Sequence, residues 1–200
     1  VWLWSVLALA TLPTAAQQNS NIAEATHPLG FYLKKVVSNT TICSGQTFSY
    51  TIYFSLPAGT QSATITDVLP SPLLFQSVSV TNACGSPTVS TPSPGTNGTV
   101  QLQWSSGSVP AGGCSGSFTI VVSFPNGTTC NGTAARNRVC MVGTVQTSQG
   151  LQTAEFCTPY VSTTAQATNT WQIQKQPLGA TWQGGNCPWK YYGDTMTYQI

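Results

Sequence analysis

The stretch TFSYTIYF at residues 47–54 alternates large apolar side chains with mostly small polar ones. Successive side chains of an extended strand point to opposite faces, so a period of two gathers the large residues on one side. One face of this segment carries Phe48, Tyr50, Ile52 and Phe54. This pattern is typical of a half-buried antiparallel strand.

The same period recurs along the chain at residues 100–104 and 118–124. We expect further strands at 31–37, 62–68, 74–81, 136–147 and 151–161, with a tight turn at 148–150 joining the last two. No segment shows a helical period with caps, and Gly, Pro and Ser separate the strands. The sequence therefore predicts an all-β protein, an antiparallel β-sandwich.

The end of the chain repeats its beginning. The run GQTFSYTI from Gly45 matches GDTMTYQI from Gly193, and Lys35 matches Lys175. The spacing of this self-similarity is that of a whole sandwich domain, so it predicts a tandem array. We expect a first repeat domain at 31–168 and the start of a second, incomplete at Ile200, at 169–200.

The residues before the first domain are typical of an export signal followed by a leader. The apolar stretch VWLWSVLALATL is too short to span a bilayer, and small residues follow it. We expect a secretory signal peptide at 1–16, although a positive n-region is missing. An apolar N-terminal strand or a membrane anchor is the alternative. A flexible leader is expected at 17–30. The protein would then be secreted or held at the cell surface, with no membrane span in the mature fragment.

Charged residues make up only 5% of the chain, and the net charge is +2. A typical soluble domain carries about 25% charged residues. There is no basic patch to attract phosphates, so we expect no nucleic-acid partner.

Six cysteines fall in the first repeat and Cys187 falls in the second. An even count in an exported domain predicts three disulfides. If successive strands run up and down, their ends suggest Cys43–Cys114, Cys84–Cys130 and Cys140–Cys157. Cys84–Cys114 stays open as an alternative, because the loop at 82–98 is long. A metal site is disfavoured, since there is no CxxC and the only histidine, His27, precedes the domain.

Turn-like sequence surrounds four N-glycosylation sequons, which begin at Asn39, Asn97, Asn126 and Asn131. Their occupancy would depend on a host that modifies this motif.

Thr66-Asp67-Val68-Leu69-Pro70 completes a series of motifs that resembles a family. The other members are Lys35 on the opening strand, Gly45 with Tyr50 and Ile52, Trp104, and Pro110-Ala111-Gly112 before SFTIVVSF. Their order is similar to that in the bacterial and archaeal surface repeat called domain of unknown function 11, or the conserved repeat domain. The resemblance covers 31–161 and implies an immunoglobulin-like sandwich in exported multi-domain proteins, without catalysis.

We expect no enzymatic activity and no cofactor. The first domain has only two acidic residues, Asp67 and Glu155, and nothing in the sequence brings them together as a catalytic pair. Asp67 is interpreted as a turn residue whose carboxylate accepts backbone N–H bonds. Lys34 and Lys35 lie on the opening strand without a nucleophile motif. Arg136 and Arg138 would share one strand face, as a solvated edge or an anion grip.

Trp104 alternates with polar residues in step with Val100 and Leu102, so we expect it to face the core. The loop of the second copy, eight residues longer than in the first, holds aromatic residues that could bind a glycan or a neighbouring domain: Trp182, Trp189, Tyr191 and Tyr192.

Two hypotheses follow. The first is a secreted or cell-surface structural protein of tandem disulfide-stabilised domains, a stalk, adhesin or filament subunit, whose partners are other copies or neighbouring repeats. The alternative is a module that binds carbohydrate or a cell-surface protein through the aromatic loop.

Overall fold

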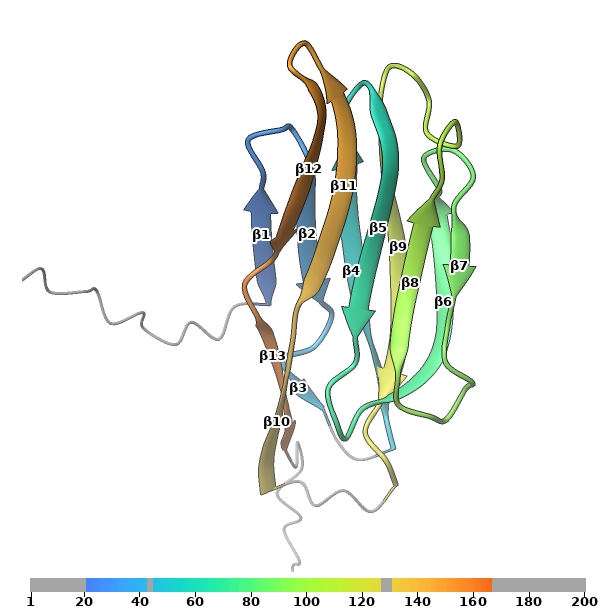
Figure 1. Cartoon of the computed structure of the whole chain (residues 1–200). Helices are drawn as coiled ribbons and strands as arrows, with labels where there is room; N and C mark the ends of the chain where they lie inside the picture. Colours follow the sequence, from blue (N-terminus) through green and yellow to red (C-terminus); the bar gives the residue numbers. More distant parts are fainter. Residues whose placement is uncertain (1–20, 43–44, 127–130, 167–200) are drawn as a thin grey trace, which may run out of the picture. The chain divides into compact units, whose positions relative to one another are not determined.

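The computed structural model describes residues 21–42, 45–126 and 131–166. These residues belong to one compact unit, Val1–Thr168. Every regular element among them is a strand, and two five-stranded sheets pack face to face (Figure 1). The predicted all-β sandwich is confirmed. The part of the chain that is described holds no helix able to span a membrane.

The first sheet has the strand order β1-β2-β4-β9-β6, with every neighbouring pair antiparallel. Its strands are β1 (Ile22–Thr26), β2 (Tyr32–Val37), β4 (Thr47–Leu56), β9 (Cys114–Ser123) and β6 (Leu74–Asn82). The alternating stretch at residues 47–54 lies in β4, at the centre of this sheet.

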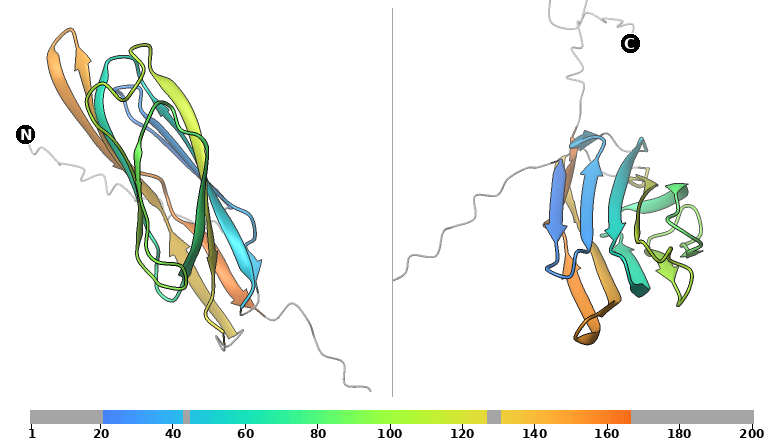
Figure 2. Two further views of the ribbon diagram at one scale, coloured as in Figure 1. Left: turned by 90° about the vertical axis from the view of Figure 1, so that its right-hand side faces the viewer. Right: turned by 90° about the horizontal axis from the view of Figure 1, so that it is seen from above.

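The second sheet has the order β12-β11-β5-β8-β7 and is also antiparallel. Its strands are β12 (Gly150–Cys157), β11 (Val139–Thr147), β5 (Thr60–Val68), β8 (Thr99–Trp104) and β7 (Thr88–Ser90). Figure 2 shows the two layers from the side and from above.

A third, three-stranded sheet lies at the lower end of the sandwich in Figure 1. It contains β10 (Asn131–Asn137), β13 (Val161–Gln166) and β3 (Thr41–Ile42). β13 is antiparallel to β10 and parallel to β3.

The inward faces of the two large sheets form one hydrophobic core. The predicted apolar face of β4 is buried throughout, and Trp104 is 1% exposed. Trp104 packs against Phe54, with 5.1 Å between ring centroids. The interpretation of Trp104 as core is confirmed.

The expected leader at 17–30 is wrong over Ile22–Thr26, which form β1 at the edge of the first sheet. Small Ala23 faces inward, and Glu24 forms a 2.9 Å ion pair with Lys34 of β2. The only large apolar side chain of this segment, Ile22, is exposed, and the inward-facing Ala23 is small. The segment therefore lacks the alternation of large and small residues that marks the other strands.

Both long strands expected near the end of the domain are divided. The run at 136–147 breaks at Arg138, where the chain passes from β10 in the small sheet to β11 in the second. Likewise 151–161 divides into β12 and β13. These crossings carry the chain into the small sheet, where β13 pairs with β10 and β3.

Candidate functional site: a buried lysine, aspartate and asparagine

Three polar side chains meet in the interior where the three sheets join. Lys35 comes from β2, Asp67 from β5 and Asn137 from the last position of β10. Lys35 and Asp67 are fully buried, and Asn137 is 1% exposed. Charged residues are almost never fully buried without a partner, so the buried Lys35 and Asp67 are expected to bind polar groups in the core.

The Asp67 carboxylate holds the cluster together. Lys35 Nζ donates to Asp67 Oδ2 and forms a buried ion pair with it. Asn137 Nδ2 donates to Asp67 Oδ1 at 2.8 Å. The two oxygens of one carboxylate therefore bind two side chains from different strands, and the amine and the carboxamide lie around the same group.

Tyr50 of β4 forms one wall of the cluster. Lys35 Nζ lies 4.2 Å from the centroid of the Tyr50 ring, a cation–π distance. Two buried polar atoms nearby, the Tyr50 hydroxyl and Asn137 Oδ1, have no hydrogen-bond partner among the described residues. An unpaired buried polar atom typically costs about 1–3 kcal/mol, so both are unusual in a stable core.

Burial dominates the protonation chemistry of this site. Removal from water lowers the pKa of Lys35, and the opposing charge and hydrogen bond of Asp67 only partly offset this. Burial likewise raises the pKa of Tyr50, which stays neutral. The cluster thus combines an amine whose pKa is lowered, a carboxylate and a carboxamide.

The sequence interpretation of Asp67 as a turn residue is wrong. Asp67 lies within β5 and accepts side-chain donors, because its position continues the inward series Ala63, Ile65. Lys35 likewise follows Leu33 and precedes Val37 on the inward face of β2. Asn137 lies between inward-facing Ala135 and Val139.

A polar residue in the apolar parity of a strand was therefore a signal available in the sequence for Lys35, Asp67 and Asn137 alike. What the sequence could not supply is the pairing, because it does not show which residues of facing sheets oppose each other.

Metal chemistry finds no support in the described ranges, where no group of three His, Cys, Asp or Glu side chains could hold an ion. His27 belongs to the domain rather than preceding it, since its ring lies 5.7 Å from that of Phe156. Glu155 is on β12 and exposed, away from Asp67 on β5.

Arg136 and Arg138 share an exposed edge, as predicted, and both guanidinium groups stack near the Tyr160 ring, at 5.0 and 5.1 Å. They line a recess of about 350 Å³ with Thr66 and Cys140.

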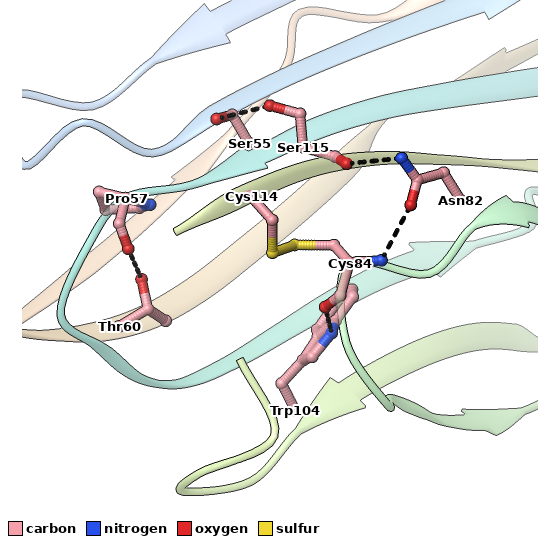
Figure 3. Close-up of a disulfide and its surroundings, with 8 residues drawn as sticks. All are labelled: Ser55, Pro57, Thr60, Asn82, Cys84, Trp104, Cys114 and Ser115. Carbon is pink, nitrogen blue, oxygen red and sulfur yellow. Dashed lines mark hydrogen bonds between the residues drawn. A yellow bond between two sulfur atoms is a disulfide. The ribbon is translucent and has the colours of Figure 1, made fainter. Parts of the chain in front are cut away.

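Two disulfide bonds cross-link the described residues. Cys140 is bonded to Cys157, directly opposite it in the β11–β12 register, the pairing expected across the turn. Cys84 is bonded to Cys114, which links the segment after β6 to the first residue of β9 (Figure 3). The expected Cys43–Cys114 and Cys84–Cys130 bonds are therefore wrong. Cys43 and Cys130 themselves lie outside the described residues.

The short strand β7 explains the error. It lies in the segment at 82–98 that was expected to be a loop, and it reverses the chain once more between β6 and β8. With this reversal Cys84 and Cys114 reach the same end of the sandwich. All three residues of β7 are exposed, so no burial period marks it in the sequence.

Cys84 has the only positive φ, 54°, of any described residue other than glycine. Three contacts hold Cys84: its side chain is bonded to Cys114, its N–H donates to Asn82 Oδ1 at 3.3 Å, and its carbonyl oxygen accepts from Trp104 Nε1. Figure 3 shows these contacts together. Such a conformation costs about 1–3 kcal/mol and persists where surrounding contacts fix it.

The sequons have different surroundings. Asn39, Asn97 and Asn126 are exposed, and the side chain of Asn131 lies outside the described set. Asn97 Nδ2, the atom that would carry a glycan, donates to Leu69 O at 3.0 Å and Leu73 O at 2.8 Å. The expected signal peptide at 1–16, the second repeat at 169–200 with Cys187, and the aromatic residues Trp182, Trp189, Tyr191 and Tyr192 also lie outside the described residues.

No family model matches the sequence, and no curated protein does. Solved structures do. BcpA, the major pilin subunit of Bacillus cereus, superposes with a TM-score of 0.51 at 15% identity, over 66% of this chain and 40% of that one. The full-length major pilin SpaD from Corynebacterium diphtheriae gives 0.50 at 20% identity, over 66% and 35%.

At such identities the likeness shows the fold alone: an immunoglobulin-like antiparallel sandwich of the kind that these pilins contain. The chain spans less than half the length of either pilin chain that it matches. Membership of the conserved repeat family stays a prediction.

Proposed function

We propose that this domain is a structural module of a secreted or cell-surface protein, which bears load within a stalk, adhesin or filament built from tandem copies. The observation that carries the proposal is the buried Lys35–Asp67–Asn137 cluster, which ties all three sheets to one another through side chains.

The position of the cluster suits that role. β2 opens the domain after the edge strand β1, and β10 belongs to the small sheet from which the chain leaves through β13. A pull on the two ends of the domain would act on β1 and β13, and the cluster joins β2 and β10, which pair with these two strands. Two disulfides add links of the same kind.

The fold shared with two major pilins supports an extracellular filament or surface role. In such a role, the domain would polymerise with further copies of the chain. The low charge also suits an exposed setting, because few ionisable groups couple folding to pH. Catalysis on an external substrate has no support in the described ranges, where Lys35, Asp67 and Asn137 are closed off from solvent.

Electron microscopy of the full chain, together with a glycan array, tests the proposal. We expect end-to-end particles or fibres and no sugar binding. Monomeric particles that bind a glycan, with binding abolished by Trp182→Ala and Trp189→Ala, would instead establish the carbohydrate-binding alternative.

A further inference from the structure

We propose that the recess at Arg136, Arg138 and Tyr160 binds an extended acidic peptide of a partner protein. The peptide pairs with the open edge of β10 and places two carboxylates, two positions apart, against the two arginines. This inference goes beyond the load-bearing role and does not depend on assembly from tandem copies.

The two arginines carry charge that the described part of the domain does not neutralise. The ion pairs among the described residues use its other two cations, Lys34 and Lys35. Arg136 and Arg138 are exposed and have no carboxylate partner in these ranges. Each guanidinium group presents five N–H donors in a planar fork that matches a carboxylate. Both forks are therefore available to an external anion.

The Tyr160 ring holds the two guanidinium groups near each other. Their Cζ atoms lie 5.0 and 5.1 Å from its centroid, both within the range of a cation–π contact. Two like charges held at one ring repel each other, and a bound anion removes this repulsion. The arrangement therefore favours a ligand of negative charge.

The recess has the size and the walls of a ligand site. Its volume is about 350 Å³, within the usual range for ligand pockets of roughly 300–1,000 Å³. Its walls include the apolar side chains of Val68 and Pro70 besides the arginines and Tyr160. Val68 is 62% exposed, so an apolar wall lies open to a ligand. Apolar walls beside two cations suit a peptide with an apolar side chain between acidic ones, whereas a small inorganic anion would leave them uncovered.

β10 offers such a peptide a backbone to pair with. It is the outer strand of the small sheet, and among the described strands it pairs only with β13. β5 ends at Val68, just past the pairing of Asp67 with Val139, and β10 runs on past this end (Figure 1). Alternate backbone N–H and C=O groups of an edge strand are open to a further strand, which is a common mode of peptide recognition.

Strand pairing also fixes the spacing of the acidic residues. Arg136 and Arg138 are two positions apart and both exposed, so they lie on one face of the extended chain. Residues two apart on an added strand share a face in the same way, and opposite charges across two strands attract. The four acidic residues of this chain are Glu24, Asp67, Glu155 and Asp194, and no two of them are two positions apart. The occupant is therefore a segment of another protein.

Isothermal titration calorimetry of the full chain with the peptide Ac-GTEVETG-NH2 tests the site. The controls, at equal ionic strength, are Ac-GTQVQTG-NH2, which lacks both charges, and Ac-GTEEVTG-NH2, which has the same composition with adjacent acids. We expect each control to bind at least about tenfold more weakly, because charge-assisted hydrogen bonds to the arginines are lost. Equal affinity for the three peptides would overturn the proposal. So would tighter binding of polygalacturonate at equal carboxylate concentration, since the ligand would then be an acidic polysaccharide.

Variants of the full chain test the two arginines. Arg136→Gln and Arg138→Gln should each weaken binding of Ac-GTEVETG-NH2 at least about fivefold, since each removes one charge-assisted contact. Lys34→Gln is the matched control, because it removes one surface cation from β2. An equal loss of affinity in Lys34→Gln would overturn the proposal. The comparison of peptides uses the unaltered protein, so the site is tested even where a variant fails to fold.

Hydrogen exchange measured by mass spectrometry tests the strand pairing itself. Amide protons at residues 134–138 should exchange more slowly when Ac-GTEVETG-NH2 is bound, and at the free rate with Ac-GTQVQTG-NH2. Binding of the acidic peptide without slower exchange in this segment would overturn the pairing with β10.

Discussion

Trp104 Nε1 donates a 2.8 Å hydrogen bond to the carbonyl oxygen of Cys84, so the core fixes the disulfide-bonded loop from the inside. Trp104→Phe would leave that buried carbonyl without its donor and would leave a void beside Phe54. We expect a loss of about 2–4 kcal/mol in the free energy of unfolding, from the lost hydrogen bond and the cavity together. Chemical denaturation measures the change.

Tyr53→Phe is the control for this substitution, because Tyr53 lies on the outward face of the same sheet as Phe54 and is 44% exposed. Its effect should stay within about 0.5 kcal/mol. Equal effects of the two variants would mean that the indole contact does not stabilise the loop.

The decrease in the free energy of unfolding at alkaline pH should depend on Tyr50. Its pKa is raised above the ordinary 10.0, chiefly by burial, so the folded state retains a proton that the unfolded state loses. The unfolded chain then binds fewer protons above pH 10.0, and stability falls as pH rises. One pH unit beyond 10.0 the loss from this group is about 1.4 kcal/mol.

Tyr50→Phe removes both that titration and a buried hydroxyl without a hydrogen-bond partner. Near neutral pH we expect the variant to be as stable as the wild type or slightly more so. The difference between the two proteins should then widen in the variant's favour above pH 10.0. Parallel pH curves from urea unfolding would contradict this, since every other tyrosine is common to both proteins.

Gly143 on β11 leaves room for the Phe31 ring beside the strand. A Cβ at position 143 would lie 2.5 Å from the Phe31 ring, which is fully buried. Gly143→Ala should therefore destabilise the domain by about 1–3 kcal/mol through overpacking. Gly112→Ala is the matched control, because a Cβ there meets no atom within 4 Å. Thermal unfolding measures both variants. A lower unfolding temperature for Gly112→Ala than for Gly143→Ala would refute the packing argument.

The two disulfides can be tested by a peptide map without reductant. We expect Cys84 with Cys114 and Cys140 with Cys157. Replacing either pair by alanine should cost about 3 kcal/mol, because the bonds close loops of 30 and 17 residues. A peptide joining Cys43 to Cys114 would contradict the structure and restore the pairing first expected from the sequence.

The sequence predicted strands wherever large residues alternate, and it missed those that lack this signal. β4 and β9 are central and buried on one face, so their period is strong. β1 and β7 are edge strands with small or exposed side chains, and only their pairing partners define them. Because β7 was not predicted, Cys84 and Cys114 were placed at opposite ends of the sandwich, whereas they lie at the same end.

The polar cluster was predictable in its parts and not as a whole. Lys35, Asp67 and Asn137 each occupy an inward parity that their neighbours reveal. Their meeting depends on the break at Arg138, which sends β10 into the small sheet, and on the facing of β2 and β5 across the core. Neither has a local sequence signal.

Asn97 should contribute to stability as an unmodified side chain. Its Nδ2 bridges Leu69 O and Leu73 O and so closes the turn that follows β5. Asn97→Gln moves the amide by one methylene and should cost about 1–2 kcal/mol, since two hydrogen bonds are lost. Asn39→Gln is the matched control and should be neutral, because Asn39 is exposed and its side chain has no hydrogen bond among the described residues.

A glycan on Nδ2 would leave one N–H, enough for only one of the two carbonyl groups. We therefore expect Asn97 to stay unmodified when the protein is expressed in a host that glycosylates sequons, while Asn39 is modified. Intact-mass analysis before and after enzymatic removal of glycans measures both. A fully occupied Asn97 with unchanged stability would show that the bridge to Leu69 and Leu73 is dispensable.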